Sequence, residues 1–370
     1  MTTPLYESIA EDIAASGPMT IERFWQIALF DRKHGYYSAR EPFGRSGDFT
    51  TAPEISQMFG ELIGAWIAGA WDQLRRPSPF LLTEIGPGRG TLMADIVRTL
   101  RSAAPACLAA ARIRLVETSE RLAALQAVRL EPFDLPIRRV RRIGEIEDLP
   151  MILVANELFD AVPIRQVVRH GGRWHERMVG LGEAGRLAFL TGRPAGPLPA
   201  WLIAGGRSGP DEGTIAEFSP AREGLAAEIS QRIARQGGAG LFIDYGHARS
   251  AVGDSFQAVR EHAFVPVLDD PGEADLTSHV DFSAISQRFS ACGNTVSPIE
   301  TQGAFLLRMG LLERAGALGA RLDEAGREAI RNDVQRLAGS GEGDMGALFK
   351  VVAAAHSPLT IPPFAAPAGD

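Results

Sequence analysis

The 370-residue sequence has few of the residues that build disulfide frameworks or metal centres. Its two cysteines, Cys107 and Cys292, cannot supply a disulfide framework or a thiolate zinc site, and they fit a reducing compartment. Its seven histidines show no H-x-x-x-H or H-x-x-E-H grouping, so we expect no metal site. The sequence also lacks G-x-S-x-G, the commonest nucleophile elbow of serine hydrolases.

Long apolar runs and an excess of basic residues are missing as well. The formal net charge of −7 gives no basis for nonspecific nucleic-acid binding. The most apolar stretch, residues 62–71, is well short of the ~20 residues that span a bilayer. The first residues show no signal or transit peptide. We therefore expect no membrane insertion and a cytoplasmic location, while the oligomeric state stays open.

The most informative segment is the glycine turn EIGPGRG at residues 84–90, which lies between an apolar run and a helix-like stretch. Such a turn lets the backbone approach a nucleotide-like cofactor, and the helix that follows presents unpaired N–H groups. A dinucleotide fingerprint would require glycine where the chain has Thr91. A dinucleotide oxidoreductase is therefore the weakest of the enzyme hypotheses.

An acidic residue follows the next predicted strand. Glu117 ends an alternating, β-branched stretch, residues 112–116. Its two carboxylate oxygens could accept hydrogen bonds from both ribose hydroxyls of a nucleoside. The order of glycine turn and acid therefore favours a nucleoside-containing cofactor.

From residue 80 onward, predicted strands alternate with predicted helices. The strands are 80–85, 113–117, 151–155 and 240–244, and the helices are 91–101, 119–130 and one that Ser219 caps. This alternation predicts an α/β fold with a mostly parallel, doubly wound sheet. Residues 303–309 could form one strand of a terminal hairpin. We expect an N-terminal helical cap with a glycine-rich lid loop (1–79), a core (80–162 and 215–356), an inserted β-hairpin or meander (163–214) and a disordered tail (357–370).

Polar residues directly after strands are the first candidates for chemistry, because ligands of doubly wound sheets bind outside the carboxyl ends of the strands. Asn156, Glu157 and Asp160 follow one predicted strand, and Asp244 and Tyr245 follow another. Taken singly, Asn156 could be a turn residue and Asp160 a local cap. As a group they indicate a site. The loop at residues 36–56 could cover a ligand or be an ordinary surface connection.

Five sequence blocks occur together in one order along the chain. They are residues 48–56 (DFTTAPEIS), 84–90, 156–163 (NELFDAVP), 243–246 (IDYG) and 275–282 (DLTSHVDF). The sequence resembles the MidA-like methyltransferases, which are related to the mitochondrial complex I assembly factor. The resemblance that these blocks carry extends over most of residues 20–310.

The resemblance implies a class I, Rossmann-like methyltransferase fold with S-adenosylmethionine as cofactor. For the mitochondrial relative it further implies symmetric dimethylation of an arginine in a respiratory complex I subunit. The usual double-acid loop of arginine methyltransferases is not evident, so Glu157 and Asp160 would take over its task. We expect cofactor binding by Glu84, Gly86, Gly88, Gly90, Glu117 and Asn156, catalysis by Glu157, Asp160, Asp244 and Tyr245, and substrate or lid contacts by Tyr36, Asp48, Phe49, Thr51 and Glu54.

Two other functions stay open at this point. The same cofactor residues would serve a methyltransferase that acts on a small molecule. An assembly chaperone that binds a respiratory-complex subunit could keep S-adenosylmethionine only as structural support. The joint presence of Glu84, Glu117, Glu157 and Asp160 argues against a dead site.

Overall fold

The computed structural model describes residues 3–39, 51–203 and 210–364. The chain forms two compact units, each built from separate segments. The sheet unit comprises Thr50–Leu158, Leu225–Ala248 and Phe282–Asp370, and the appended unit comprises Met1–Phe49, Phe159–Gly224 and Arg249–Asp281. Each unit is described by itself below.

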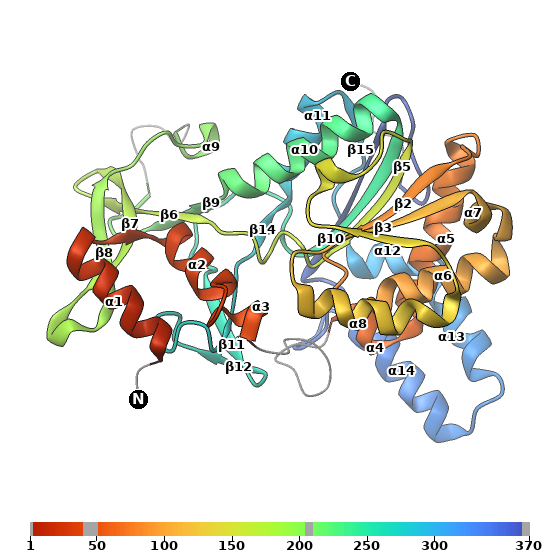
Figure 1. Ribbon diagram of the computed structural model, residues 1–370, viewed down its shortest axis with the longest axis horizontal. Helices are drawn as coiled ribbons and strands as arrows, with labels where there is room; N and C mark the ends of the chain where they lie inside the picture. The colour runs from red at the N-terminus through yellow and green to blue at the C-terminus, as the bar shows by residue number, and fades with distance from the viewer. Residues whose placement is uncertain (1–2, 40–50, 204–209, 365–370) are drawn as a thin grey trace. The chain divides into compact units, whose positions relative to one another are not determined.

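The sheet unit is built on a mostly parallel sheet (Figure 1). Its strands run in the order β15-β17-β10-β5-β2-β3-β4. β17 is antiparallel to both of its neighbours, whereas β4, β3, β2, β5 and β10 are mutually parallel. The strands are β2 (Phe80–Ile85), β3 (Ala111–Val116), β4 (Ile137–Val140), β5 (Met151–Asn156), β10 (Gly238–His247), β15 (Asn294–Val296), β16 (Glu300–Thr301) and β17 (Phe349–His356).

Helices cover both faces of the sheet, and its central strands are largely apolar. Every residue of β2 and β5 is buried, as expected for parallel strands with both faces covered. The helices of this unit are α4 (Ala52–Ile55), α5 (Gln57–Gln73), α6 (Thr91–Ala103), α7 (Pro105–Ala110), α8 (Glu120–Leu130), α11 (Phe282–Ala291), α12 (Gln302–Arg308), α13 (Leu311–Gly319) and α14 (Glu324–Ala338), with short 3-10 turns at Glu131–Phe133 and Ile143–Glu145.

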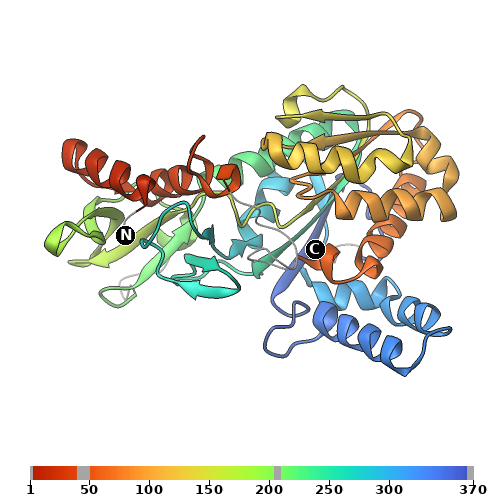
Figure 2. The same cartoon turned by 60° about the horizontal axis from the view of Figure 1, so that its bottom comes forward.

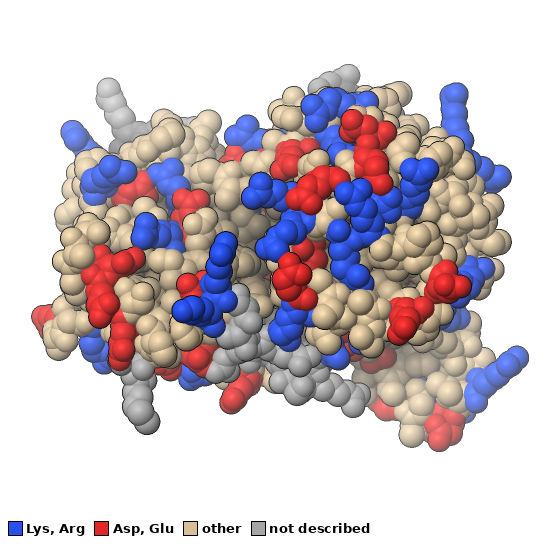
Figure 3. Space-filling model, in the orientation of Figure 1, with Lys and Arg blue, Asp and Glu red and all other residues tan. Residues whose placement is uncertain are grey.

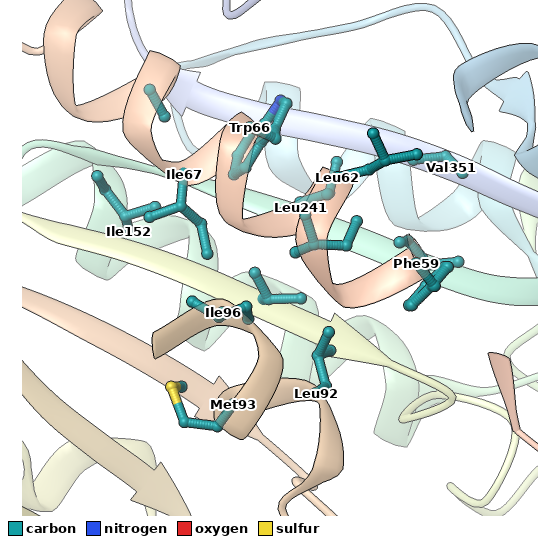
Figure 4. Packing of buried hydrophobic residues seen from close by; sticks show 14 of the residues in the cluster. Phe59, Leu62, Trp66, Ile67, Leu92, Met93, Ile96, Ile152, Leu241 and Val351 are labelled. Atoms are coloured by element: carbon teal, nitrogen blue, oxygen red, sulfur yellow. The ribbon is translucent and has the colours of Figure 1, made fainter. Parts of the chain in front are cut away.

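One face of the sheet packs against α5 and α6. Figure 4 shows Phe59, Leu62 and Trp66 of α5 next to side chains of α6 and the strands. On the opposite face, Phe242 of β10 packs on Phe289 of α11 with ring centroids 4.5 Å apart. Because α5 buries its apolar stripe against the sheet, this helix belongs to the sheet unit. The structure thus splits the predicted N-terminal cap (1–79) between the two units.

The last helices, α12 to α14, pack together as one group (Figure 2). The prediction of a strand at 303–309 was wrong, since these residues lie mainly in α12. Thr301 caps this helix by accepting a hydrogen bond from the Ala304 amide at 3.2 Å. Gly303 allows close packing, because a Cβ there would come within 2.4 Å of the Ala338 carbonyl of α14.

The predicted disordered tail is partly ordered. Ile361 and Phe364 are buried in the core of the sheet unit, and the Phe364 ring stacks on Phe305 with centroids 5.5 Å apart. Residues 365–370 lie outside the described part of the chain. The expectation of a disordered tail was therefore wrong for residues 357–364, because apolar side chains hold this segment to the core.

The appended unit combines helices with two small sheets (Figure 1). In one sheet the order is β1-β7-β6-β9 with β8 beside β7, and in the other it is β12-β11-β13. The β-hairpin or meander expected at 163–214 contains β6, β7 and β8. Elements of this unit are α1 (Pro4–Ser16), β1 (Met19–Thr20), α2 (Ile21–Phe30), α3 (Tyr36–Ala39), β6 (Arg165–His170), β7 (Arg173–Leu181), a 3-10 turn (Glu183–Gly185), β8 (Leu187–Pro194), α9 (Ala200–Ile203), β9 (Ile215–Phe218), β11 (Gln257–Arg260), β12 (Ala263–Val265), β13 (Asp275–Thr277) and β14 (Val280–Asp281).

One helix, α10 (Pro220–Gln236), begins in the appended unit and continues in the sheet unit. As predicted, Ser219 caps it, and its hydroxyl accepts a hydrogen bond from the Arg222 amide at 3.0 Å. The core of the appended unit lies under α1 and α2, where Trp25 stacks on Phe256 with centroids 4.8 Å apart.

Candidate functional site

The glycine turn connects β2 to α6 and adopts backbone conformations that favour glycine. Gly86, Gly88 and Gly90 have φ angles of 67°, 51° and 79°. A hydrogen bond of 2.7 Å from the Gly90 amide to the Pro87 carbonyl closes the turn. Without side chains at these three positions, a ligand can approach the backbone at the start of α6.

Glu84 lies at the end of β2 and is buried. Burial raises the pKa of its carboxyl, the charge of Glu117 also raises it, and a hydrogen bond from the Met93 amide lowers it. Together these effects bring the pKa to about 8. Within the described residues, its Oε2 atom is buried without a hydrogen-bond partner. Such an atom is costly unless something binds it. Glu84 is therefore suited to meet the cation of a ligand.

The raised pKa predicts a pH-dependent stability. Native Glu84 keeps its proton up to about pH 8, whereas the unfolded carboxyl loses it near its ordinary pKa of 4.5. Stability should therefore fall as pH rises through this window, by at most about 1.4 kcal/mol per pH unit. Thermal unfolding between pH 5 and pH 8 should show a shallower decline for Glu84→Gln than for the wild type. The exposed Glu342→Gln is the matched control, and equal slopes in all three proteins would contradict the prediction.

Glu117 follows β3 directly, as predicted, and both of its oxygens are held. The Ser119 amide donates to Oε1 at 2.7 Å, and the Gln126 side chain donates to Oε2 at 3.0 Å. Gln126 also donates to the Gly88 carbonyl at 2.8 Å, so it links the acid to the glycine turn. The carboxylate is thereby oriented, and each oxygen still has a lone pair for a ligand.

The contacts of Gln126 were not predicted, although the sequence carries a signal for them. Gln126 lies on the buried face of α8 between Leu122 and Leu130, where helical spacing would otherwise place an apolar residue.

A second contact that was not predicted explains Thr91, which occupies the position of the absent glycine. Its hydroxyl donates to the Glu54 carboxylate in a very short contact. Glu54 therefore holds the start of α6.

The ends of β5 and β10 are adjacent, because Asn156 pairs with Ile243 in their parallel register. Asn156 donates its side-chain amide to Glu157 Oε1 at 2.9 Å, and the Glu157 amide donates to the Ile243 carbonyl at 2.9 Å. Glu157 has a φ of 52°, an unusual conformation for a residue other than glycine. Strain of this kind gathers at functional sites, so this observation supports a functional role for Glu157.

The strand β10 contributes two of the predicted residues. Asp244 is buried, and one of its oxygens accepts a hydrogen bond from the Tyr245 amide at 2.9 Å. The Tyr245 ring packs edge to face on Phe349, with centroids 5.5 Å apart. The sheet unit thus brings together Glu84, Glu117, Asn156, Glu157 and Asp244 at the carboxyl ends of neighbouring strands, as in other doubly wound sheets.

Asp160, the predicted partner of Glu157, belongs to the appended unit. Burial raises the pKa of the Tyr37 hydroxyl, and the charges of Asp275 and Asp160 raise it further. The Tyr37 hydroxyl donates to Asp275 at 3.2 Å. The backbone of Asp160 is fixed by Arg222, which donates to its carbonyl at 3.0 Å and to the His279 carbonyl at 2.8 Å. Asp160 therefore does not belong to the unit that holds Glu157.

The predicted lid, residues 36–56, is divided as well. Tyr36 is fully buried in the core of the appended unit, so its assignment as a lid or substrate residue was wrong. Thr51 is the N-cap residue of α4 in the sheet unit. Asp48 and Phe49 lie outside the described residues.

Neither a metal cluster nor a membrane span is found in the described parts of the chain. No group of three His, Cys, Asp or Glu residues there could hold a metal ion. No described helix is long and apolar enough to cross a membrane.

The chain is similar to known proteins in both sequence and structure. The family model described as "Putative S-adenosyl-L-methionine-dependent methyltransferase" matches residues 62–299. The rat mitochondrial protein arginine methyltransferase NDUFAF7 is 33% identical over 90% of this chain and 80% of its own length, and the human protein is 32% identical over 90% and 78%. A crystal structure from Burkholderia thailandensis, bound to S-adenosyl-homocysteine, has a TM-score of 0.80 and 26% identity, and the match covers 95% of this chain and 92% of that one.

Proposed function

This chain belongs to the family of S-adenosyl-L-methionine-dependent methyltransferases, and we propose that it methylates an arginine side chain of a protein. One observation carries the proposal. Similarity to the named protein arginine methyltransferases extends over 90% of the chain, through both compact units and not only through the glycine turn and its sheet. A respiratory complex I subunit, which the resemblance to the assembly factor suggests, is the target that we propose.

The residues after β2 and β3 fit the cofactor. We assign the orphaned Glu84 Oε2 atom as the acceptor for an ammonium group, and the fixed Glu117 carboxylate as the acceptor for two ribose hydroxyls. The glycine turn leaves the backbone accessible beside them. When bound, S-adenosylmethionine supplies the electrophilic methyl group on its sulfonium.

The task of the remaining acids is to hold the acceptor. The pKa of a guanidinium group exceeds ~12, so the group is protonated at neutral pH. Carboxylates bind it through paired hydrogen bonds. We assign this contact first to Glu157, whose carboxylate is oriented by Asn156 and whose neighbour across the strands is Asp244. Asp160 stays a second candidate. Such binding would orient the attacking nitrogen and stabilise its charge during transfer.

Methyl labelling tests the proposal directly. The purified protein is incubated with methyl-labelled S-adenosylmethionine and protein extract from cells that lack it, and labelled protein is hydrolysed to amino acids. We expect the label in methylated arginine. Label in small molecules would support a methyltransferase of another substrate class. Cofactor binding with no label in any fraction, together with capture of a complex I subunit, would support the chaperone hypothesis.

The cytoplasmic location expected from the sequence stays a prediction. The named relatives carry the word mitochondrial in their names, so they give it no support. Fractionation of cells with an antibody against the native protein would test it.

A further inference from the structure

An arginine-rich stretch runs through β3, α8 and β4. Residues 112–142 contain eight arginines and four acids, in a chain whose net charge is −7. Figure 3 shows blue Lys and Arg atoms in a band over α8 and the segment that follows it, with some red atoms among them. A local positive field of this kind attracts acidic partners.

The strand β4 forms one edge of the sheet. It pairs with β3 on one side, and no strand in the described residues pairs with its other side. An edge strand presents unpaired N–H and C=O groups, to which another extended segment can add. Arginines on such an edge hinder pairing with a second copy of the same edge, because the like charges repel each other.

A pocket lies beside β4. Protection of the edge from pairing with a second copy would not require a pocket. Its volume is about 520 Å³. Five apolar side chains line it together with three charged ones, Glu131, Asp134 and Arg139. Val128 of α8, one of these side chains, is 71% exposed. A segment that adds to β4 would place alternate side chains on the same face, as strands do. The pocket can take one of them.

Several arginines of this stretch already have acidic partners. Glu147 binds Arg114 and Arg138, and Glu120 binds Arg141. In contrast, the Nε atom of Arg139 and the Nε and Nη2 atoms of Arg121 are buried and donate to no acceptor in the described residues. Buried donors without acceptors are rare in folded proteins, and a carboxylate would satisfy them with charge-assisted hydrogen bonds.

We propose that the open edge of β4, its arginines and the adjacent pocket bind an acidic segment with alternating apolar residues from a partner protein. The segment adds as a strand beside β4, inserts an apolar side chain next to Val128, and pairs its acids with Arg139 and its neighbours. This surface is independent of the proposed methyl transfer, so the two can fail separately.

Fluorescence anisotropy with the full chain tests the proposal. The probe is a fluorescein-labelled ten-residue peptide of alternating glutamate and leucine. We expect binding that weakens at least tenfold in Val128→Glu and in the double variant Arg139→Gln with Arg142→Glu. Arg321→Glu, an exposed arginine of the same unit, is the matched control and should bind as the wild type does. Amide exchange of residues 137–142 should slow when the peptide binds.

Three results would overturn the proposal. Unchanged affinity in both variants would exclude this surface. Equal affinity for a peptide whose backbone nitrogens are methylated would exclude strand addition, because that peptide cannot pair with an edge. Tighter binding of a ten-nucleotide single-stranded DNA, lost in the same variants, would assign the arginines to phosphate recognition.

Discussion

Methyl transfer should fall about a thousandfold when Glu157 is replaced by glutamine, while the affinity for S-adenosylmethionine stays within twofold. Glutamine keeps the shape of the side chain and can still accept the hydrogen bond from Asn156 that now measures 2.9 Å. It removes the negative charge that would hold a guanidinium group. Loss of one preorganised electrostatic contact costs about 10²–10³ in rate, and a misplaced acceptor adds to that loss.

The measurement is single-turnover transfer to the labelled protein substrate, with calorimetry for the cofactor. Glu342→Gln, an equivalent change at an exposed position, should leave both quantities unchanged. Full transfer activity in Glu157→Gln would remove this residue from the proposed acceptor site. Loss of cofactor affinity along with activity would instead place Glu157 on the cofactor side.

The second large effect is expected for Glu117→Ala, which should weaken S-adenosylmethionine binding by at least about a hundredfold. Two charge-assisted hydrogen bonds to the ribose would be lost, each worth about 1.5–3 kcal/mol. Ser119 and Gln126 would also lose their acceptor, since both now donate to this carboxylate. Calorimetric titration measures the change.

Glu120→Ala is the control for this experiment, because Glu120 lies close by in the sequence but is exposed and forms a salt bridge with the exposed Arg141. Its affinity should match the wild type. Circular dichroism of both variants shows whether the domain is folded. A folded Glu117→Ala protein with unchanged affinity would refute the ribose role.

Local sequence patterns predicted the glycine turn and the position of Glu117 well. The glycine turn and Glu117 each depend on a few neighbouring residues, and strand-turn-helix order is visible in the sequence. Gln126 could also have been predicted, since a polar residue on the apolar face of a helix needs a partner.

Long-range contacts decided the features that the sequence analysis missed. Residues 303–309 are a short apolar run that suits a strand as well as a helix, and the packing of Gly303 against α14 selects the helix. Tyr36 lies in a stretch whose composition is typical of a loop, but its side chain is buried in the core of the appended unit. The two units were also not predicted, because each consists of segments far apart in the chain.

The antiparallel strand β17 has a consequence for synthesis. It lies between β10 and β15 in the sheet, yet it is the last strand of the described chain to be made. Until the ribosome has released residues 349–356, the nascent sheet exposes the backbone of β10 and leaves β15 without its neighbour. Chaperone binding during translation should therefore persist until this strand has emerged, since an open apolar edge is prone to aggregate.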